Sequence, residues 1–148
     1  SYIKNFFQIY IQCLTKKYFQ FSERANSKEY FIFLLFDSII SFFIAFIFNS
    51  LLWKYFFMIT TIPCYAVSIR RLHDVNKTGW WILIITPIPY IILYFYGLQV
   101  LETTSQILKI LFLITLIFMI GVFLWFNTYL LLKKGIPDAN KYGKPPTD

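Results

Sequence analysis

Apolar residues fill four long runs of the chain, and polar residues gather in the short segments between them. The runs cover residues 30–48, 51–69, 80–98 and 107–132. Each run is close to the length of about 20 residues that a helix needs to cross the hydrocarbon core of a bilayer. Lipid offers no partner to backbone amides, so such a run favours a helix. The pattern therefore predicts an all-α membrane protein with four transmembrane helices.

The polar breaks between the runs predict how these helices connect. Asn49 and Ser50 alone separate the first two runs, which indicates a tight helical hairpin. Ser27 can cap the first spanning helix, because its hydroxyl can accept a bond from a free amide. Residues 70–79 form a polar loop, and residues 133–148 form a polar cytoplasmic tail rich in glycine and proline. The whole chain, residues 1–148, is thus predicted to be one integral membrane domain.

Residues 2–20 carry a different pattern, that of an amphipathic helix. Apolar side chains recur there at helical spacing, while the opposite side carries Lys4, Gln8, Gln12 and Lys16. Such a helix can lie in the membrane interface with its apolar face down. It can equally pack on the cytoplasmic face of its own protein, because periodicity does not separate the two arrangements.

The basic residues predict the orientation of the chain. Four spans place twelve of the fourteen lysines and arginines on one side of the membrane, and leave Lys54 and Lys109 on the other. Short cytoplasmic loops carry an excess of lysine and arginine. We therefore expect both termini in the cytoplasm.

Composition agrees with a membrane location and excludes several classes of function. The chain is 58% hydrophobic and only 14% charged, whereas soluble domains are about 25% charged. The net charge of +7 does not indicate nucleic-acid binding, because the basic residues flank the apolar runs. Cys13 and Cys64 stand far apart, and the sequence holds one histidine, so we expect free thiols, no metal and no cofactor.

Three motifs occur in order along the chain. They are FSERANSKEY at residues 21–30, RRLHDVNKTGWW at residues 70–81 and GIPDANKYGKP at residues 135–145. In this order they resemble the bacterial inner-membrane family called domain of unknown function 805, over nearly the whole chain. The middle motif is the specific one. The resemblance implies a small multi-pass protein of the inner membrane, and it brings no catalytic or binding residues.

The motifs depart from the family pattern at four positions. Glu23 stands where the family has glycine, Ser27 where it has arginine, Phe31 where it has tryptophan and Thr78 where it has serine. The missing arginine at position 27 argues against a role that needs two basic groups in the first motif.

Arg70, Arg71, His73 and Asp74 form the densest polar cluster of the sequence. A pair of planar arginines at a helix end suits a phosphate or a lipid headgroup. The alternative is that the arginines anchor the helix end, with Asp74 paired to a neighbouring arginine. His73 and Asp74 resemble an acid–base pair, but no nucleophile or metal ligand converges on them, and we predict no catalytic residues.

Asp37 is the one charged residue of the first apolar run. A carboxylate in a spanning helix costs roughly 2.5–3.5 kcal/mol on insertion scales, so it should face protein or water. Counting from the helix ends predicts an intramembrane polar layer of Asp37, Tyr65, Thr86 and Asn127. This layer can serve helix packing, or it can form part of an ion path.

Three classes of function remain open from the sequence. The first is a non-enzymatic module that binds a protein partner or anionic lipid headgroups through its basic cytoplasmic face. The second is a transporter or channel subunit, a homo-oligomer built around Asp37. The third is an enzyme that acts on lipids or envelope intermediates through the region of His73.

Overall fold

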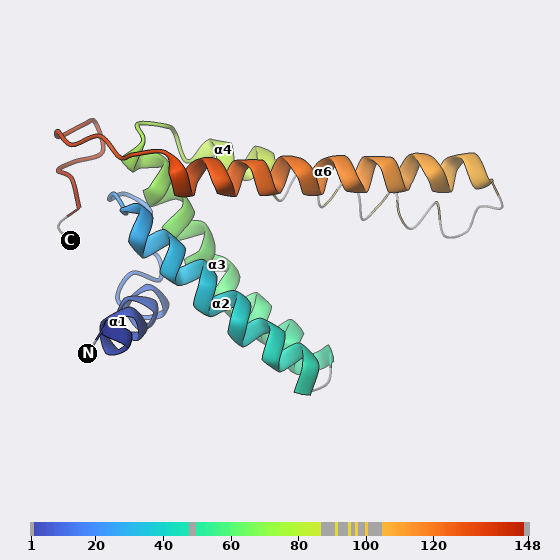
Figure 1. The fold of residues 1–148 in the computed structure, drawn as a ribbon, viewed down its shortest axis with the longest axis horizontal. Coiled ribbons are helices and arrows are strands. Elements are labelled where there is room, and N and C mark those ends of the chain that lie inside the picture. Colours follow the sequence, from blue (N-terminus) through green and yellow to red (C-terminus); the bar gives the residue numbers. More distant parts are fainter. Residues whose placement is uncertain are drawn as a thin grey trace. The chain divides into compact units, whose positions relative to one another are not determined.

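The computed structural model describes residues 2–47, 50–86 and 105–146, together with residues 91, 95, 97 and 100. Within these residues the secondary structure is helical, apart from one isolated bridge between Asn140 and Gly143. Figure 1 labels the helices α1 (Tyr2–Leu14), α2 (Ser27–Ile47), α3 (Ser50–Asp74), α4 (Trp80–Ile85) and α6 (Gln106–Leu132).

Three of these helices are long and apolar enough to cross a membrane. They are α2, residues Leu51–Asp74 of α3, and α6. This agrees with the predicted all-α membrane protein. The third predicted run begins with α4, but nine of its nineteen residues lie outside the described residues. The count of four spans therefore stays a prediction.

The chain divides into two compact units, which are described separately. The first consists of residues 1–79 and 131–148, and the second of residues 80–130. The second unit contains most of α6, whose apolar side chains are exposed along its length. In the same unit, a Cβ atom on Gly97 would lie 3.3 Å from the ring of Phe112, so residue 97 packs against α6.

The residue that caps helix α2 lies one position before the predicted cap, Ser27. The side-chain oxygen of Asn26 accepts a hydrogen bond from the backbone N–H of Glu29 at 2.7 Å. Asn26, and not Ser27, is therefore the capping residue. An asparagine in this position satisfies an amide that has no partner within the helix.

Helix α3 continues past the predicted end of its apolar run at residue 69 and stops at Asp74. Its end has the geometry of a Schellman motif. The N–H of Lys77 donates to the carbonyl of Leu72 at 2.8 Å, and Asn76 adopts a positive φ of 59°. Asparagine tolerates this left-handed conformation better than most residues. The residues from Arg70 to Asp74 are therefore helical and not part of a loop.

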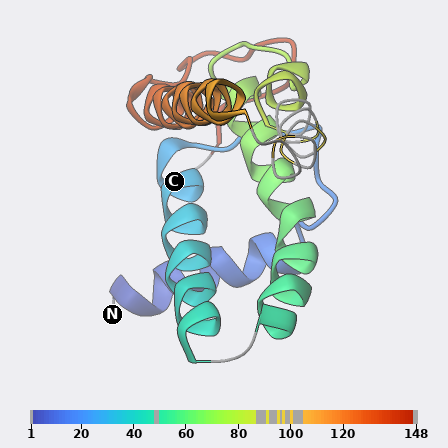
Figure 2. The ribbon, with the colours of Figure 1, turned by 90° about the vertical axis from the view of Figure 1, so that its right-hand side faces the viewer.

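Helix α1 is shorter than the predicted amphipathic segment, because the chain turns between residues 15 and 19. It crosses the antiparallel pair formed by α2 and α3 (Figure 2). The ring of Tyr10 packs on Phe33, with 5.5 Å between ring centroids, and the ring of Phe7 packs edge-on against Phe36. These aromatic contacts hold α1 against the hairpin and bury Tyr10, while Phe7 stays half exposed.

Candidate functional site

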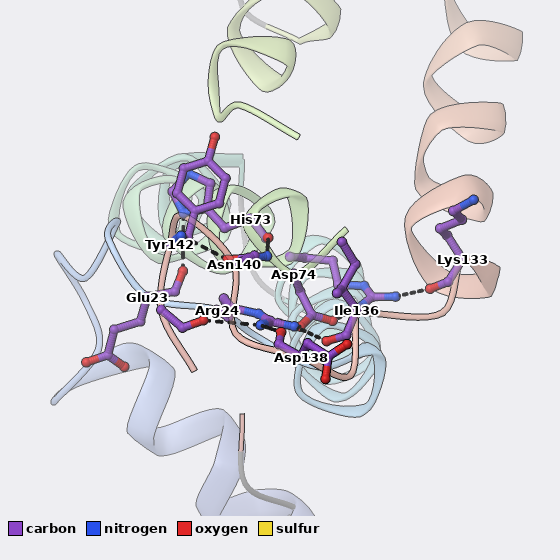
Figure 3. Close-up of polar contacts among 11 residues, drawn as sticks. Glu23, Arg24, His73, Asp74, Lys133, Ile136, Asp138, Asn140 and Tyr142 are labelled. Carbon is purple, nitrogen blue, oxygen red and sulfur yellow. Dashed lines mark hydrogen bonds and ion pairs between the residues drawn. The ribbon is translucent and has the colours of Figure 1, made fainter. Parts of the chain in front are cut away.

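Asp74 lies between two arginines that come from different parts of the first unit. Its Oδ1 atom accepts hydrogen bonds from Arg24 Nε at 3.0 Å and from Arg24 Nη2 at 2.9 Å. Its Oδ2 atom forms an ion pair with Arg71. All three side chains are at most 4% exposed. Figure 3 shows Arg24 and Asp74 next to Ile136 and Asp138. The first and second motifs therefore meet in one buried ion-pair cluster.

The third motif joins this cluster through its backbone. Residues 133–146, here called the C-terminal strap, follow α6 as turns and extended chain. Arg24 donates to the carbonyl oxygens of Asp138 at 2.8 Å and Gly143 at 3.3 Å, and also to that of Ile136. Arg71 donates to the carbonyl of Lys133, and the N–H of Ile136 donates to the carbonyl of Asp74. The strap is held mainly through main-chain atoms.

The charge balance of the cluster explains why the strap is needed. Arg24 and Arg71 bring two buried cations, while Asp74 brings one carboxylate. A buried charge is unfavourable unless charged or polar partners compensate it. The carbonyl oxygens of the strap supply the remaining acceptors for the two guanidinium groups. The three motifs are thus parts of one network that is complete only when all of them are present.

His73 contacts the strap from the same end of α3. Its ring stacks on that of Tyr142, with centroids 3.7 Å apart and an interplanar angle of 7°. Its Nδ1 atom lies 3.2 Å from the carbonyl oxygen of Glu23, and Asn140 donates to the His73 carbonyl at 2.9 Å. The ring therefore holds neighbouring segments together. No group of three or more metal-ligating side chains occurs among the described residues.

Arg70 belongs to a second buried cluster, on the side of α3 that faces α1. It donates to Glu29 Oε1 at 2.5 Å, and Lys17 pairs with Glu29 Oε2 at 3.0 Å. The thiol of Cys13 lies 3.5 Å from Glu29 Oε1. Glu29 therefore ties α1 to the ends of α2 and α3. Among the described residues, Arg70 Nε is a buried nitrogen without a hydrogen-bond partner.

The chemical environment of Cys13 predicts an unreactive thiol. Burial and then the neighbouring Glu29 carboxylate raise the pKa of the Cys13 thiol to about 11. The thiolate is the reactive form, so at neutral pH we expect Cys13 to be alkylated about two orders of magnitude more slowly than an ordinary exposed thiol.

This rate can be measured with a soluble maleimide on a Cys64→Ser variant, in which Cys13 is the remaining cysteine. The rate should rise as the pH approaches the raised pKa, and unfolding in SDS should abolish the protection. Equal rates in the native and SDS-treated protein would contradict this assignment.

The structure places the predicted phosphate-binding residues inside the protein. Arg70 and Arg71 are fully buried, and both bind carboxylates of the chain itself. Binding of a phosphate by Arg70, Arg71, His73 and Asp74 stays a prediction, and the observed contacts give these residues an internal role. Their partners Arg24 and Glu29 were not singled out from the sequence, although both stand in the first motif.

The predicted polar layer is only partly placed. Asp37 is half-buried, accepts a hydrogen bond from the Tyr10 hydroxyl at 3.4 Å and is also hydrogen-bonded to Thr60. The remaining members, Tyr65, Thr86 and Asn127, were expected beside it. Thr86 and Asn127 belong to the second unit, where each donates to a carbonyl one turn earlier in the chain. A common layer therefore stays a prediction.

Comparison with known proteins gives one family match. A family model described as a protein of unknown function (DUF805) matches residues 18–144, which include the first two motifs and all of the third except Pro145. Searches of curated proteins and of solved structures give no match.

Proposed function

This chain belongs to the DUF805 family of proteins of unknown function, and we propose that it is a non-enzymatic module of a bacterial inner membrane that binds anionic lipid headgroups. Its apolar helices make it a membrane protein of several passes. We further propose four spans, with both termini and the segment after Asp74 in the cytoplasm. The excess of lysine and arginine in these segments supports this orientation.

The observation that carries the proposal is a difference in burial between the arginines and the lysines of the first unit. The arginines of the first unit are buried and bind carboxylates of the chain. Most of its lysines are instead exposed, in α1 and the turn after it, at the start of α2, after α3 and along the strap: Lys4, Lys16, Lys28, Lys77, Lys133, Lys134, Lys141 and Lys144. The positive charge that a headgroup can reach is therefore that of lysine.

Lysine suits this role physically. Its ammonium group is a mobile point charge that does not need a planar, bidentate partner. Each lysine near an anionic membrane surface contributes about 1 kcal/mol of attraction. We therefore assign headgroup binding to the exposed lysines and not to Arg70 and Arg71. An acidic protein partner would use the same lysines, and the experiment below separates the two partners.

The proposal predicts a preference for anionic lipid that depends on the strap lysines. The test compares the association of spin-labelled phosphatidylglycerol and phosphatidylcholine with the reconstituted protein. A variant with Lys133, Lys134, Lys141 and Lys144 changed to glutamine should bind phosphatidylglycerol about fivefold more weakly for each 1 kcal/mol of lost attraction. High salt should weaken the preference of the original protein in the same way.

The matched control is Lys54→Gln. Lys54 is also exposed, but it lies close to the first residue of α3, at the opposite end of that helix from Arg70. Its removal should leave the cytoplasmic preference unchanged. If the variant with four glutamines keeps the full preference for phosphatidylglycerol, the lysines serve another partner and the lipid proposal is wrong.

A further inference from the structure

Helix α1 and the turn of residues 15–19 that follows it fix a level along the α2–α3 hairpin, because their contacts reach both ways along these helices. Toward the cytoplasmic end, Lys17 reaches Glu29 in the first turn of α2. Toward the hairpin tip, Tyr10 reaches Asp37 of α2, and the Tyr18 hydroxyl donates to the Ile59 carbonyl of α3 at 2.7 Å. The axis of α1 therefore lies midway between these contacts, beside Phe33.

The side chains of α1 indicate which medium surrounds it at this level. The face that points away from the hairpin is polar and exposed, with Lys4, Asn5, Gln8, Gln12 and Lys16. On the flank toward the hairpin tip, the exposed apolar side chains of Phe7 and Ile11 continue the apolar surface of α2, since Phe7 contacts Phe36. Two lysines and three amides cannot lie in hydrocarbon, whereas this division suits a helix in the headgroup layer.

The level of α1 limits how deep the hairpin can reach. Helix α2 ends at Ile47, and from Phe33 to this residue the rise of about 1.5 Å per residue gives a depth of about 21 Å. The hydrocarbon core of a typical bilayer is about 30 Å thick. The hairpin is therefore shorter than the core when α1 lies at the interface.

Residues near the tip agree with a short span. Lys54 and Tyr55 are exposed there, and Trp53 donates from its indole nitrogen to Ser41 at 2.9 Å. Tryptophan, tyrosine and lysine are the side chains that favour the membrane–water interface. Because side chains lean toward the N-terminus of a helix, Lys54 leans toward the tip and can reach the far headgroups.

We infer that α1 lies in the cytoplasmic headgroup layer beside Phe33, and that the short α2–α3 hairpin thins the bilayer around it. A hydrophobic segment shorter than the hydrocarbon core is accommodated by local thinning, and each ångström of mismatch has an energetic cost. Lipids with short chains remove this cost, so they should gather around the hairpin. The inference rests on α1 and the hairpin, and does not require the proposed binding of headgroups by the strap lysines.

The test measures which lipids contact the hairpin, by quenching of tryptophan fluorescence with brominated phosphatidylcholine. The chain has four tryptophans. A variant that keeps only Trp53 reports on the hairpin, and a variant that keeps only Trp125 reports on α6. Helix α6 has 27 residues and a length of about 40 Å, so it serves as a matched control without a short span.

The expected result is that lipid with dimyristoleoyl chains binds beside Trp53 about twofold or more tightly than lipid with dioleoyl chains. The variant with Trp125 should show no preference for the shorter chains. A second measurement uses a spin label at Leu35, which lies about 3 Å below the level of Phe33. This label should be accessible to a water-soluble nickel chelate.

Two outcomes would overturn the inference. One is tightest binding of dioleoyl or longer chains beside Trp53. The other is a label at Leu35 that is as inaccessible to the nickel chelate as a label at Phe42, since both would then lie in hydrocarbon. The spin-label result does not depend on lipid chain preference, so it also decides the case if the tryptophan variants fold poorly.

Discussion

Replacing Asp74 by asparagine is expected to destabilise the protein more than any other isosteric substitution in the first unit. The substitution keeps the size of the side chain but removes the carboxylate that forms ion pairs with both Arg24 and Arg71. Both arginine side chains are at most 1% exposed, so they would stay buried as cations without the ion pair to Asp74. Breaking a buried pair in this way costs about 3–5 kcal/mol. The free energy of unfolding, measured by SDS titration in mixed micelles, reports the loss.

Asp138→Asn is the matched control for this prediction. Asp138 also contacts Arg24, but it does so through its carbonyl oxygen, and its side chain is exposed. The free energy of unfolding should therefore change by no more than about 0.5 kcal/mol. Equal losses in the two variants would show that the carboxylate of Asp74 has no special role.

Replacing Gly135 by alanine is expected to release the C-terminal strap while every polar group of the protein stays in place. A Cβ atom at position 135 would lie 2.0 Å from Asp74 Oδ2, far inside van der Waals contact. Asp74 cannot move away, because two arginines hold its carboxylate. Such overpacking costs about 1–3 kcal/mol. Hydrogen exchange of the Ile136 amide, which donates to the Asp74 carbonyl at 3.0 Å, should become faster.

Gly121→Ala provides the comparison. Gly121 lies inside α6, and a Cβ atom there would meet nothing within 4 Å. Alanine also favours a helix by about 1 kcal/mol over glycine. Exchange of the strap amides should therefore stay slow in this variant. If the Ile136 amide remains equally protected in Gly135→Ala, the strap has room that the structure does not indicate.

The hydrophobic pattern predicted the spanning helices well where apolar residues continue, and less well where they end. It placed α2 and most of α3, because burial in lipid requires a long apolar run. It assigned Arg70 and Arg71 to a loop, since charged residues usually mark the end of a span. The helix continues through them because Glu29 pairs with Arg70, and Asp74, three residues further on, pairs with Arg71. Local periodicity contains no information about a partner as distant as Glu29.

The same reasoning explains what the sequence revealed of the candidate site. The cluster from Arg70 to Asp74 stood out by its density of polar side chains. Glu29 is 41 residues from Arg70, so spacing gave no reason to pair them. The strap contributes mainly carbonyl oxygens, which every residue has, and a backbone acceptor leaves no side-chain signature. Only the occurrence of three motifs in one order indicated that these segments work together.

The contact between Arg24 and the strap has a consequence for how the protein is made. Arg24 and Asp138 are separated by 114 positions, and translation proceeds at about 5–20 residues per second. About 6–23 s therefore pass between the synthesis of Arg24 and that of Asp138. Until then Arg24 can pair with Asp74 but lacks the carbonyl oxygens of the strap. A chain that is cut short before the strap lacks these acceptors permanently, so we expect truncation at the C-terminal end to destabilise the first motif as well.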